Sequence, residues 1–320
     1  MAAGRGRRCA CALVLLLAGI SAGCGDEAAE RGAARSAEHP QAGGNGILVY
    51  AVPSAPVRLD PLFAESAGAR TIVAQIYEPL VANLRRPYGQ AGRERGLSRS
   101  WTVSEDSTVW SFRLRHGVRF QDGSPFNAAA VLANAERWSS EARGRALLPG
   151  LIGVDAPRPD LVRFVLARPS PGLPGRLASP QLGIVSPRVL AASAREERLN
   201  RAQGAGSGPF ALLRRGEAAV RLTRNGEWWG TAEGLGPALD GVQFPIVSDQ
   251  RQRAGLLRGG QAQAASRLDR AVARRLSRDP LLLAVREADS RWLGMERSVR
   301  GLGGRPSSFA TVWLTSLGQP

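Results

Sequence analysis

Residues Leu97–Val131 read LSRSWTVSEDSTVWSFRLRHGVRFQDGSPFNAAAV, and this stretch says more about the fold than any other part of the chain. Within it, Thr108–Arg115 alternates between apolar and polar residues. Trp110, Phe112 and Leu114 therefore share one face, which is the period of a half-buried antiparallel strand. An antiparallel sheet is expected here.

A turn and a helix follow this strand. Asp122-Gly123 is a turn signal, and Asn127 is a suitable cap for a helix that runs to about Trp138. Upstream, the apolar run Gly46–Ala51 predicts a buried strand, and helical spacing over residues 69–77 follows it, as in an α/β domain. Ser186-Pro187 and Ser248 are expected to begin helices, and residues 169–175 are expected to form a loop. Further strands are predicted at residues 80–84, 161–167, 210–214, 219–225, 241–247, 261–268, 281–285, 292–295 and 309–317.

The charge of the chain is high but has no obvious focus in the sequence. The 320 residues carry a formal charge of +16, and every one of the 43 Lys+Arg residues is arginine. No basic block with interleaved aromatic residues occurs, so we expect no nucleic-acid partner.

The amino terminus indicates export. Arg5, Arg7 and Arg8 precede the apolar run Ala10–Ala22, which is shorter than the roughly 20 residues that span a bilayer. This pattern predicts a signal peptide over residues 1–23. Its removal takes away three arginines and no acidic residue, which leaves a formal charge of +13. The small residues before Cys24 resemble a lipoprotein cleavage site, with Ser21 where an aliphatic residue is usual, and an ordinary secretory signal is the alternative. Residues 24–46 then form a lipid-anchored flexible tether.

The order of elements and motifs resembles the extracellular solute-binding proteins of peptide and nickel ABC transporters, family 5. The resemblance covers roughly residues 45–300, and its most specific part is Leu97–Val131. Shorter matching pieces are Leu59-Asp60-Pro61, Tyr77-Glu78-Pro79-Leu80, Gly206-Ser207-Gly208-Pro209-Phe210 and Asn225-Gly226-Glu227-Trp228-Trp229.

This resemblance implies an α/β fold of the periplasmic-binding-protein type II kind. Residues 47–320 would form the solute-binding-like domain, a mixed-sheet lobe with an inserted α+β subdomain at about residues 85–200. It implies a peptide ligand, capture without catalysis, and ABC transporter permease subunits as partners. The N-terminal lipid anchor would hold the protein at the outer face of the cytoplasmic membrane.

We expect the second lobe of the family to be largely absent. Trp292-Leu293-Gly294-Met295-Glu296 stands where the family has Tyr-x-Gly-Phe-Asn at the entry to that lobe. We interpret residues 281–300 as a residual crossover and residues 309–317 as the carboxy-terminal return strand after an internal deletion. Simple truncation is the rival explanation. A one-lobe scaffold or sensor that works with a partner protein is therefore the alternative function.

Candidate ligand-binding residues follow from the resemblance, each with a structural alternative. The first group is Ala64, Glu65 and Ser66, and the alternative for Ser66 is a helix cap. The second group is Ser207, Gly208, Pro209 and Phe210, whose alternative role is a turn. The third group is Trp292 and Glu296, whose alternative role is core packing. Trp110, Phe112, Asp122 and Gly123 are expected to be structural.

The residues argue against an enzyme. The two histidines, His39 and His116, supply neither a histidine-based triad nor a multi-histidine metal site. The glycine-rich segments lack the Lys and Ser/Thr of a phosphate-binding loop. We therefore expect no catalytic residues, no metal and no cofactor.

Overall fold

The fold comes from a computed structural model that describes residues 46–81, 96–192, 195–200, 205–233, 237, 239–279, 282–286 and 293–297. The predicted signal peptide, nearly all of the tether and the return strand at 309–317 lie outside the described residues.

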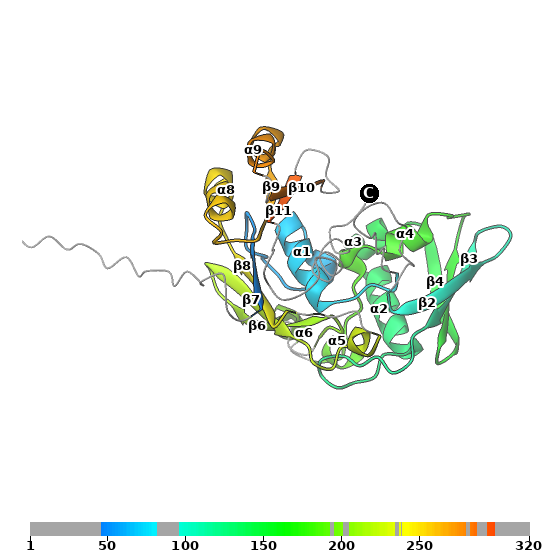
Figure 1. The fold of residues 1–320 in the computed structure, drawn as a ribbon. Helices are drawn as coiled ribbons and strands as arrows, with labels where there is room; N and C mark the ends of the chain where they lie inside the picture. Colours follow the sequence, from blue (N-terminus) through cyan, green and yellow to red (C-terminus); the bar gives the residue numbers. More distant parts are fainter. Residues whose placement is uncertain are drawn as a thin grey trace, which may run out of the picture. The chain divides into compact units, whose positions relative to one another are not determined.

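Seven of the described strands form a mixed sheet, here called the large sheet (Figure 1). Its order is β10-β11-β9-β1-β8-β7-β6. Central β1 pairs in parallel with β8 and β9, whereas the outer pairs are antiparallel. The strands are β1 (Ile47–Ala51), β6 (Phe210–Arg215), β7 (Ala219–Arg224), β8 (Gly241–Pro245), β9 (Ala264–Leu268), β10 (Leu282–Arg286) and β11 (Leu293–Arg297).

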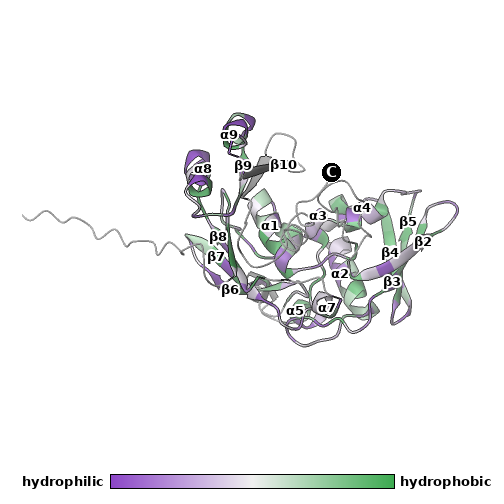
Figure 2. Cartoon of the chain, viewed as in Figure 1, coloured by the Kyte–Doolittle hydropathy of each residue, from purple (hydrophilic) through white to green (hydrophobic). Residues whose placement is uncertain are grey.

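Helices cover both faces of the large sheet. On one face, α1 (Ala67–Ile76) packs with Tyr50 of β1 and Phe244 of β8. On the other face, α8 (Gln250–Arg258) and α9 (Arg270–Leu276) pack with Val49 of β1. Figure 2 shows α8 with a hydrophilic and a hydrophobic side. Because successive residues of β1 enter different cores, its sequence is apolar throughout rather than alternating.

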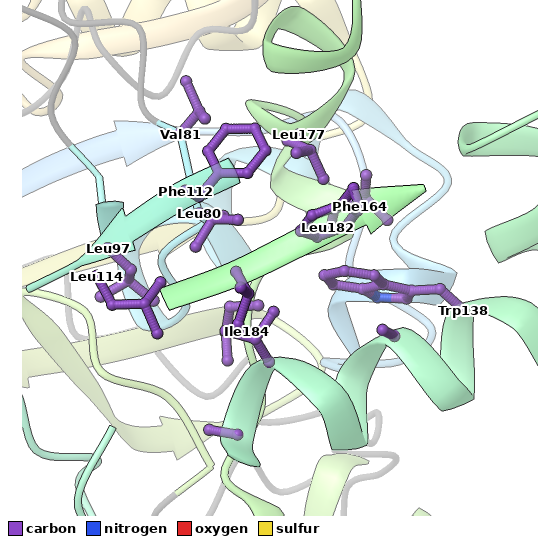
Figure 3. Packing of buried hydrophobic residues seen from close by; sticks show 14 of the residues in the cluster. Leu80, Val81, Leu97, Phe112, Leu114, Trp138, Phe164, Leu177, Leu182 and Ile184 are labelled. Carbon is purple, nitrogen blue, oxygen red and sulfur yellow. The ribbon is translucent and has the colours of Figure 1, made fainter. Parts of the chain in front are cut away.

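The remaining described strands form an antiparallel sheet, here called the small sheet, with the order β2-β3-β5-β4. They are β2 (Ser98–Val103), β3 (Val109–Leu114), β4 (Leu151–Arg158) and β5 (Leu161–Leu166). Its inner face packs on α2 (Ala128–Ser140), where Phe112 and Phe164 meet edge to face at 5.4 Å beside Trp138 (Figure 3). The small sheet lies inside residues 85–200, and the limits of an inserted subdomain there stay a prediction.

Short helical elements lie in the segments between the longer helices and the strands. They are η1 (Pro61–Phe63), α3 (Ala142–Leu147), α4 (Leu173–Leu177), η2 (Pro180–Leu182), α5 (Pro187–Leu190), α6 (Arg195–Asn200) and α7 (Trp229–Ala232).

Most predicted elements are present, and the errors have local causes. Asn127 caps α2 as predicted. Ser248 does not cap α8, because the Asp249 side chain accepts the hydrogen bond from the Gln252 amide instead, at 2.8 Å. Leu80 and Val81 fill the core beneath the small sheet and are not in a strand, while the rest of the strand predicted at 80–84 lies outside the described residues. Helix α4 begins inside the predicted loop at 169–175.

A buried ion pair joins the loop after β1 to α2. Asp60 and Arg137 form this pair with side chains only 7% and 8% exposed. Asp60 also accepts a hydrogen bond from the Leu62 amide at 3.1 Å and so begins η1. Removing one member of such a pair leaves an unpaired charge in a dry environment, which is more costly than losing a surface pair.

We expect Asp60→Asn to lower the free energy of unfolding by about 3 kcal/mol, because the amide keeps the cap but leaves the Arg137 charge uncompensated. Urea denaturation at pH 7 measures this loss. The control is Asp155→Asn, which breaks the exposed Arg163–Asp155 pair and should change stability far less. Equal losses in the two variants would contradict the assignment.

Candidate ligand-binding site

The topology of the large sheet singles out the carboxyl ends of β1 and β8. These strands are adjacent and parallel. The chain leaves β1 toward α1 on one face and leaves β8 toward α8 on the opposite face. Such a switch point is where open α/β sheets bind ligands, because the two departing loops separate there.

The loop after β8 is fixed by a buried arginine. Arg253 of α8 is 2% exposed and donates to the carbonyl oxygens of Val247 and Ser248 at 2.6 and 2.8 Å. It also donates to the carbonyls of Ser266 and Arg267 at 3.1 and 2.8 Å. Since its donors are used on backbone oxygens, Arg253 shapes this side of the switch point.

The loop after β1 runs from residue 52 to residue 66 and contains three of the predicted ligand-binding residues. Ala64 is fully buried. The Ser66 hydroxyl accepts the Ala69 amide at 3.0 Å, so Ser66 caps α1. Glu65 has a side chain that is 63% exposed and forms an ion pair with Arg143 of α3. Glu65 is therefore the member of this group that the structure presents to solvent.

Three arginines surround one aromatic ring in this loop, a group here called the Phe63 arginine cluster. The guanidinium carbons of Arg58, Arg137 and Arg143 lie 5.3, 5.9 and 5.4 Å from the Phe63 ring centroid. Cation–π attraction holds guanidinium groups over such a ring. Because Arg58, Arg137 and Arg143 are far apart or isolated in the sequence, no scan for a basic block finds them.

A second cluster unites three of the short motifs around the carboxylate of Glu78. The Ser207 hydroxyl donates to Oε2 at 2.9 Å, and Trp228 Nε1 donates to Oε1 at 3.1 Å. Trp229 Nε1 donates to both oxygens, at 3.0 and 2.9 Å, and the Arg115 guanidinium lies 4.0 Å from the Trp229 ring centroid. Glu78 is only 9% exposed. Burial raises the pKa of its carboxyl to about 7, although the hydrogen bonds from Trp229, Ser207 and Trp228 and the charge of Arg115 oppose this shift.

The Ser207–Phe210 segment is packed against the end of α1. A Cβ on Gly206 would lie 1.9 Å from the Ile76 carbonyl oxygen, and one on Gly208 would lie 2.6 Å from the Gln75 carbonyl oxygen. Only glycine permits this approach. Ser207 and Phe210 are fully buried, so the segment has a clear packing role. Ligand contact by Ser207, Gly208, Pro209 and Phe210 stays a prediction.

The structure separates the predicted site residues into two places. Phe210 begins β6 opposite Arg224, at the edge of the large sheet where β1 starts. Ala64, Glu65 and Ser66 follow the other end of β1. Trp292 lies outside the described residues, and of Glu296 only the backbone is described, in β11 opposite Ala264.

Within the described residues, no group of three or more His, Cys, Asp or Glu side chains is arranged to hold a metal ion. In the same part of the chain, no helix has the length and hydropathy needed to cross a membrane.

Comparison with known proteins decides the family. The model described as bacterial extracellular solute-binding proteins, family 5 Middle, matches residues 94–298. The chain belongs to this family. The resemblance seen in the motifs is therefore confirmed, and the family is one of non-catalytic solute-binding proteins.

The similar proteins are about twice as long as the matched region. The glutathione-binding protein GsiB of Escherichia coli O1:K1 / APEC is 30% identical over 222 residues, which cover 68% of this chain and 41% of GsiB. AgaA of A.tumefacien R10, solved with agropinic acid, is 25% identical with a TM-score of 0.65, over 76% of this chain and 48% of AgaA. DppA of Helicobacter pylori, solved with the peptide STSA, is 23% identical with a TM-score of 0.63, over 78% of this chain and 52% of DppA. These matches confirm the predicted fold class, and the chain spans about half the length of such relatives.

The pKa of Glu78 gives a testable pH dependence. Since the folded pKa of about 7 lies above the ordinary value of 4.5, the folded state binds the proton more tightly. The stabilisation is complete below about pH 4.5 and is lost as the pH rises through 7, by up to about 3 kcal/mol. Glu78→Gln should remove this component, as measured by urea denaturation at pH 5 and pH 8.

Asp106 provides a control, because its pKa is shifted in the direction opposite to that of Glu78. Hydrogen bonds from Ser104 and Thr108 lower the pKa of its carboxyl. Asp106→Asn should therefore cost stability at neutral pH and not in strong acid. A pH profile of Glu78→Gln parallel to that of the wild type would contradict the role of Glu78.

Proposed function

We propose that this protein is the membrane-tethered substrate-binding component of an ABC importer and captures peptides without catalysis. The observation that carries the proposal is the family-5 match over residues 94–298, in a fold that keeps the switch point at β1 and β8. GsiB is a glutathione-binding protein and DppA was solved with a peptide, which favours peptides as the ligand class. The permease subunits of the importer are the expected partners.

The tether belongs to the same proposal. Cleavage before Cys24 would leave that residue as the single cysteine of the mature chain, available for a lipid. A flexible chain of the length of residues 25–46 spans about 25 Å as a coil. The solute-binding domain would thus remain close to the outer face of the cytoplasmic membrane.

A departure from the family's motif favours a second candidate. Because Trp292-Leu293-Gly294-Met295-Glu296 stands where the family has Tyr-x-Gly-Phe-Asn, a one-lobe scaffold or sensor that acts with a partner protein is the alternative. Closure of two lobes around a ligand needs a second body to move.

Ligand capture is tested by calorimetry and thermal unfolding of the full chain with glutathione and with pools of dipeptides and tripeptides. Saturable heat and a raised Tm are expected, because a ligand that binds only the folded state stabilises it. No shift across the whole pool would reject peptide capture and favour the scaffold. Unfolded chain incubated with the same pool is the control for nonspecific heat.

Lipidation is tested by Cys24→Ala in a bacterial host that processes lipoproteins. The wild-type chain should incorporate labelled fatty acid and sediment with membranes, whereas the variant should do neither. Cys11→Ala, within the predicted signal peptide, is the matched control and should behave like the wild type. Equal membrane recovery and labelling of Cys24→Ala would reject the anchor.

A further inference from the structure

We propose that the Phe63 arginine cluster binds a carboxylate of the ligand, so that the protein selects peptides with an acidic side chain. This inference rests on the proposed peptide capture. Arg58 and Arg143 make the contact, while Arg137 holds the cluster in place.

The position of the cluster suits a ligand site. Phe63 ends η1, in the loop that leaves the carboxyl end of β1. This is the side of the large sheet where the switch point lies. Ser66 then begins α1 directly after the cluster, and the amino end of that helix adds positive potential.

The three arginines differ in exposure, and this difference divides their roles. The Arg137 side chain is 8% exposed and is paired with buried Asp60, so its charge is compensated inside the protein. The Arg58 and Arg143 side chains are 44% and 41% exposed. A ligand can therefore reach the guanidinium groups of Arg58 and Arg143 without opening the core.

The nearby ring of Phe63 prepares these two groups for a carboxylate. Their guanidinium carbons lie 5.3 and 5.4 Å from its centroid, where the ring attracts the positive charge without accepting a conventional hydrogen bond. The N–H donors of a guanidinium group match the two oxygens of a carboxylate, and such charge-assisted hydrogen bonds are the strong ones. Because Phe63 restricts both side chains, less rotational freedom is lost when a ligand binds.

The carboxylates that form ion pairs with Arg58 and Arg143 in this structure compete only weakly with a ligand carboxylate. Arg58 lies 3.3 Å from Glu196, whose side chain is 71% exposed. Arg143 is paired with Glu65, whose side chain is 63% exposed. Solvent-exposed ion pairs contribute little, so a ligand carboxylate can replace either acidic side chain. The backbone of the loop would keep its shape meanwhile, since Arg70 Nη1 donates to the Glu65 carbonyl oxygen at 2.5 Å.

The test compares Ala-Glu-Ala with Ala-Gln-Ala, which have nearly the same shape and differ by one charge. Calorimetry on the full chain in mild detergent should show about fivefold tighter binding of Ala-Glu-Ala at low salt, with the preference falling as salt is added. In Arg58→Gln/Arg143→Gln the preference should fall below about twofold, with Ala-Gln-Ala bound as before. The control Arg99→Gln/Arg113→Gln loses the same charge from exposed sites on β2 and β3 and should keep the preference.

A second variant changes binding in the opposite direction, which misfolding cannot imitate. Glu65→Gln removes the competing carboxylate of Arg143 and should tighten Ala-Glu-Ala binding by about threefold while leaving Ala-Gln-Ala unchanged. Persistence of the preference in Arg58→Gln/Arg143→Gln, or its absence in the wild type, would overturn the inference and leave peptide capture standing. Failure of both peptides and of the wider pool to bind would overturn the proposed function itself.

Discussion

The carboxylate of Glu78 accepts hydrogen bonds from the side chains of Ser207, Trp228 and Trp229, which lie 129, 150 and 151 residues away in the sequence. It follows α1, whereas Ser207 precedes β6 of the large sheet and the two tryptophans lie at α7. The Glu78 carbonyl oxygen also accepts the Ile184 amide at 2.9 Å, and Ile184 belongs to the core of the small sheet. One buried acidic group thus connects segments that serve both sheets, and its desolvation is offset by donors that only the assembled fold provides.

Buried and exposed charged residues have different roles in this protein. Asp60–Arg137 and the carboxylate of Glu78 are shielded from solvent; the first holds the loop after β1, and the second holds the segment after α1. Arg58 and Arg143 instead remain accessible, held over Phe63 by weak contacts. The same residue type therefore serves as a structural element at position 137 and as a binding group at positions 58 and 143.

The sequence predicted the sheet-forming segments better than it predicted the site. Thr108–Arg115 and the Asn127 cap encode their structure locally, by alternation and by one side chain, so β3 and α2 were predictable. β2 (SRSWTV) and β4 (LIGVDAPR) were missed because few of their side chains are buried and their patterns are irregular. Ser207 and Glu78 were known only as parts of separate motifs, and the Phe63 arginine cluster depends on tertiary contacts that no local pattern encodes.

The pairing of β1 has a consequence for the order in which the chain folds. Ile47 pairs with Gly241 and Tyr50 pairs with Ala264, so the first of the described strands can pair only after much of the later chain has been synthesised. The small sheet, by contrast, is complete within residues 98–166. Closing such long loops is slow compared with forming local contacts. The small sheet should therefore form first, and the large sheet cannot form until β8 and β9 are available.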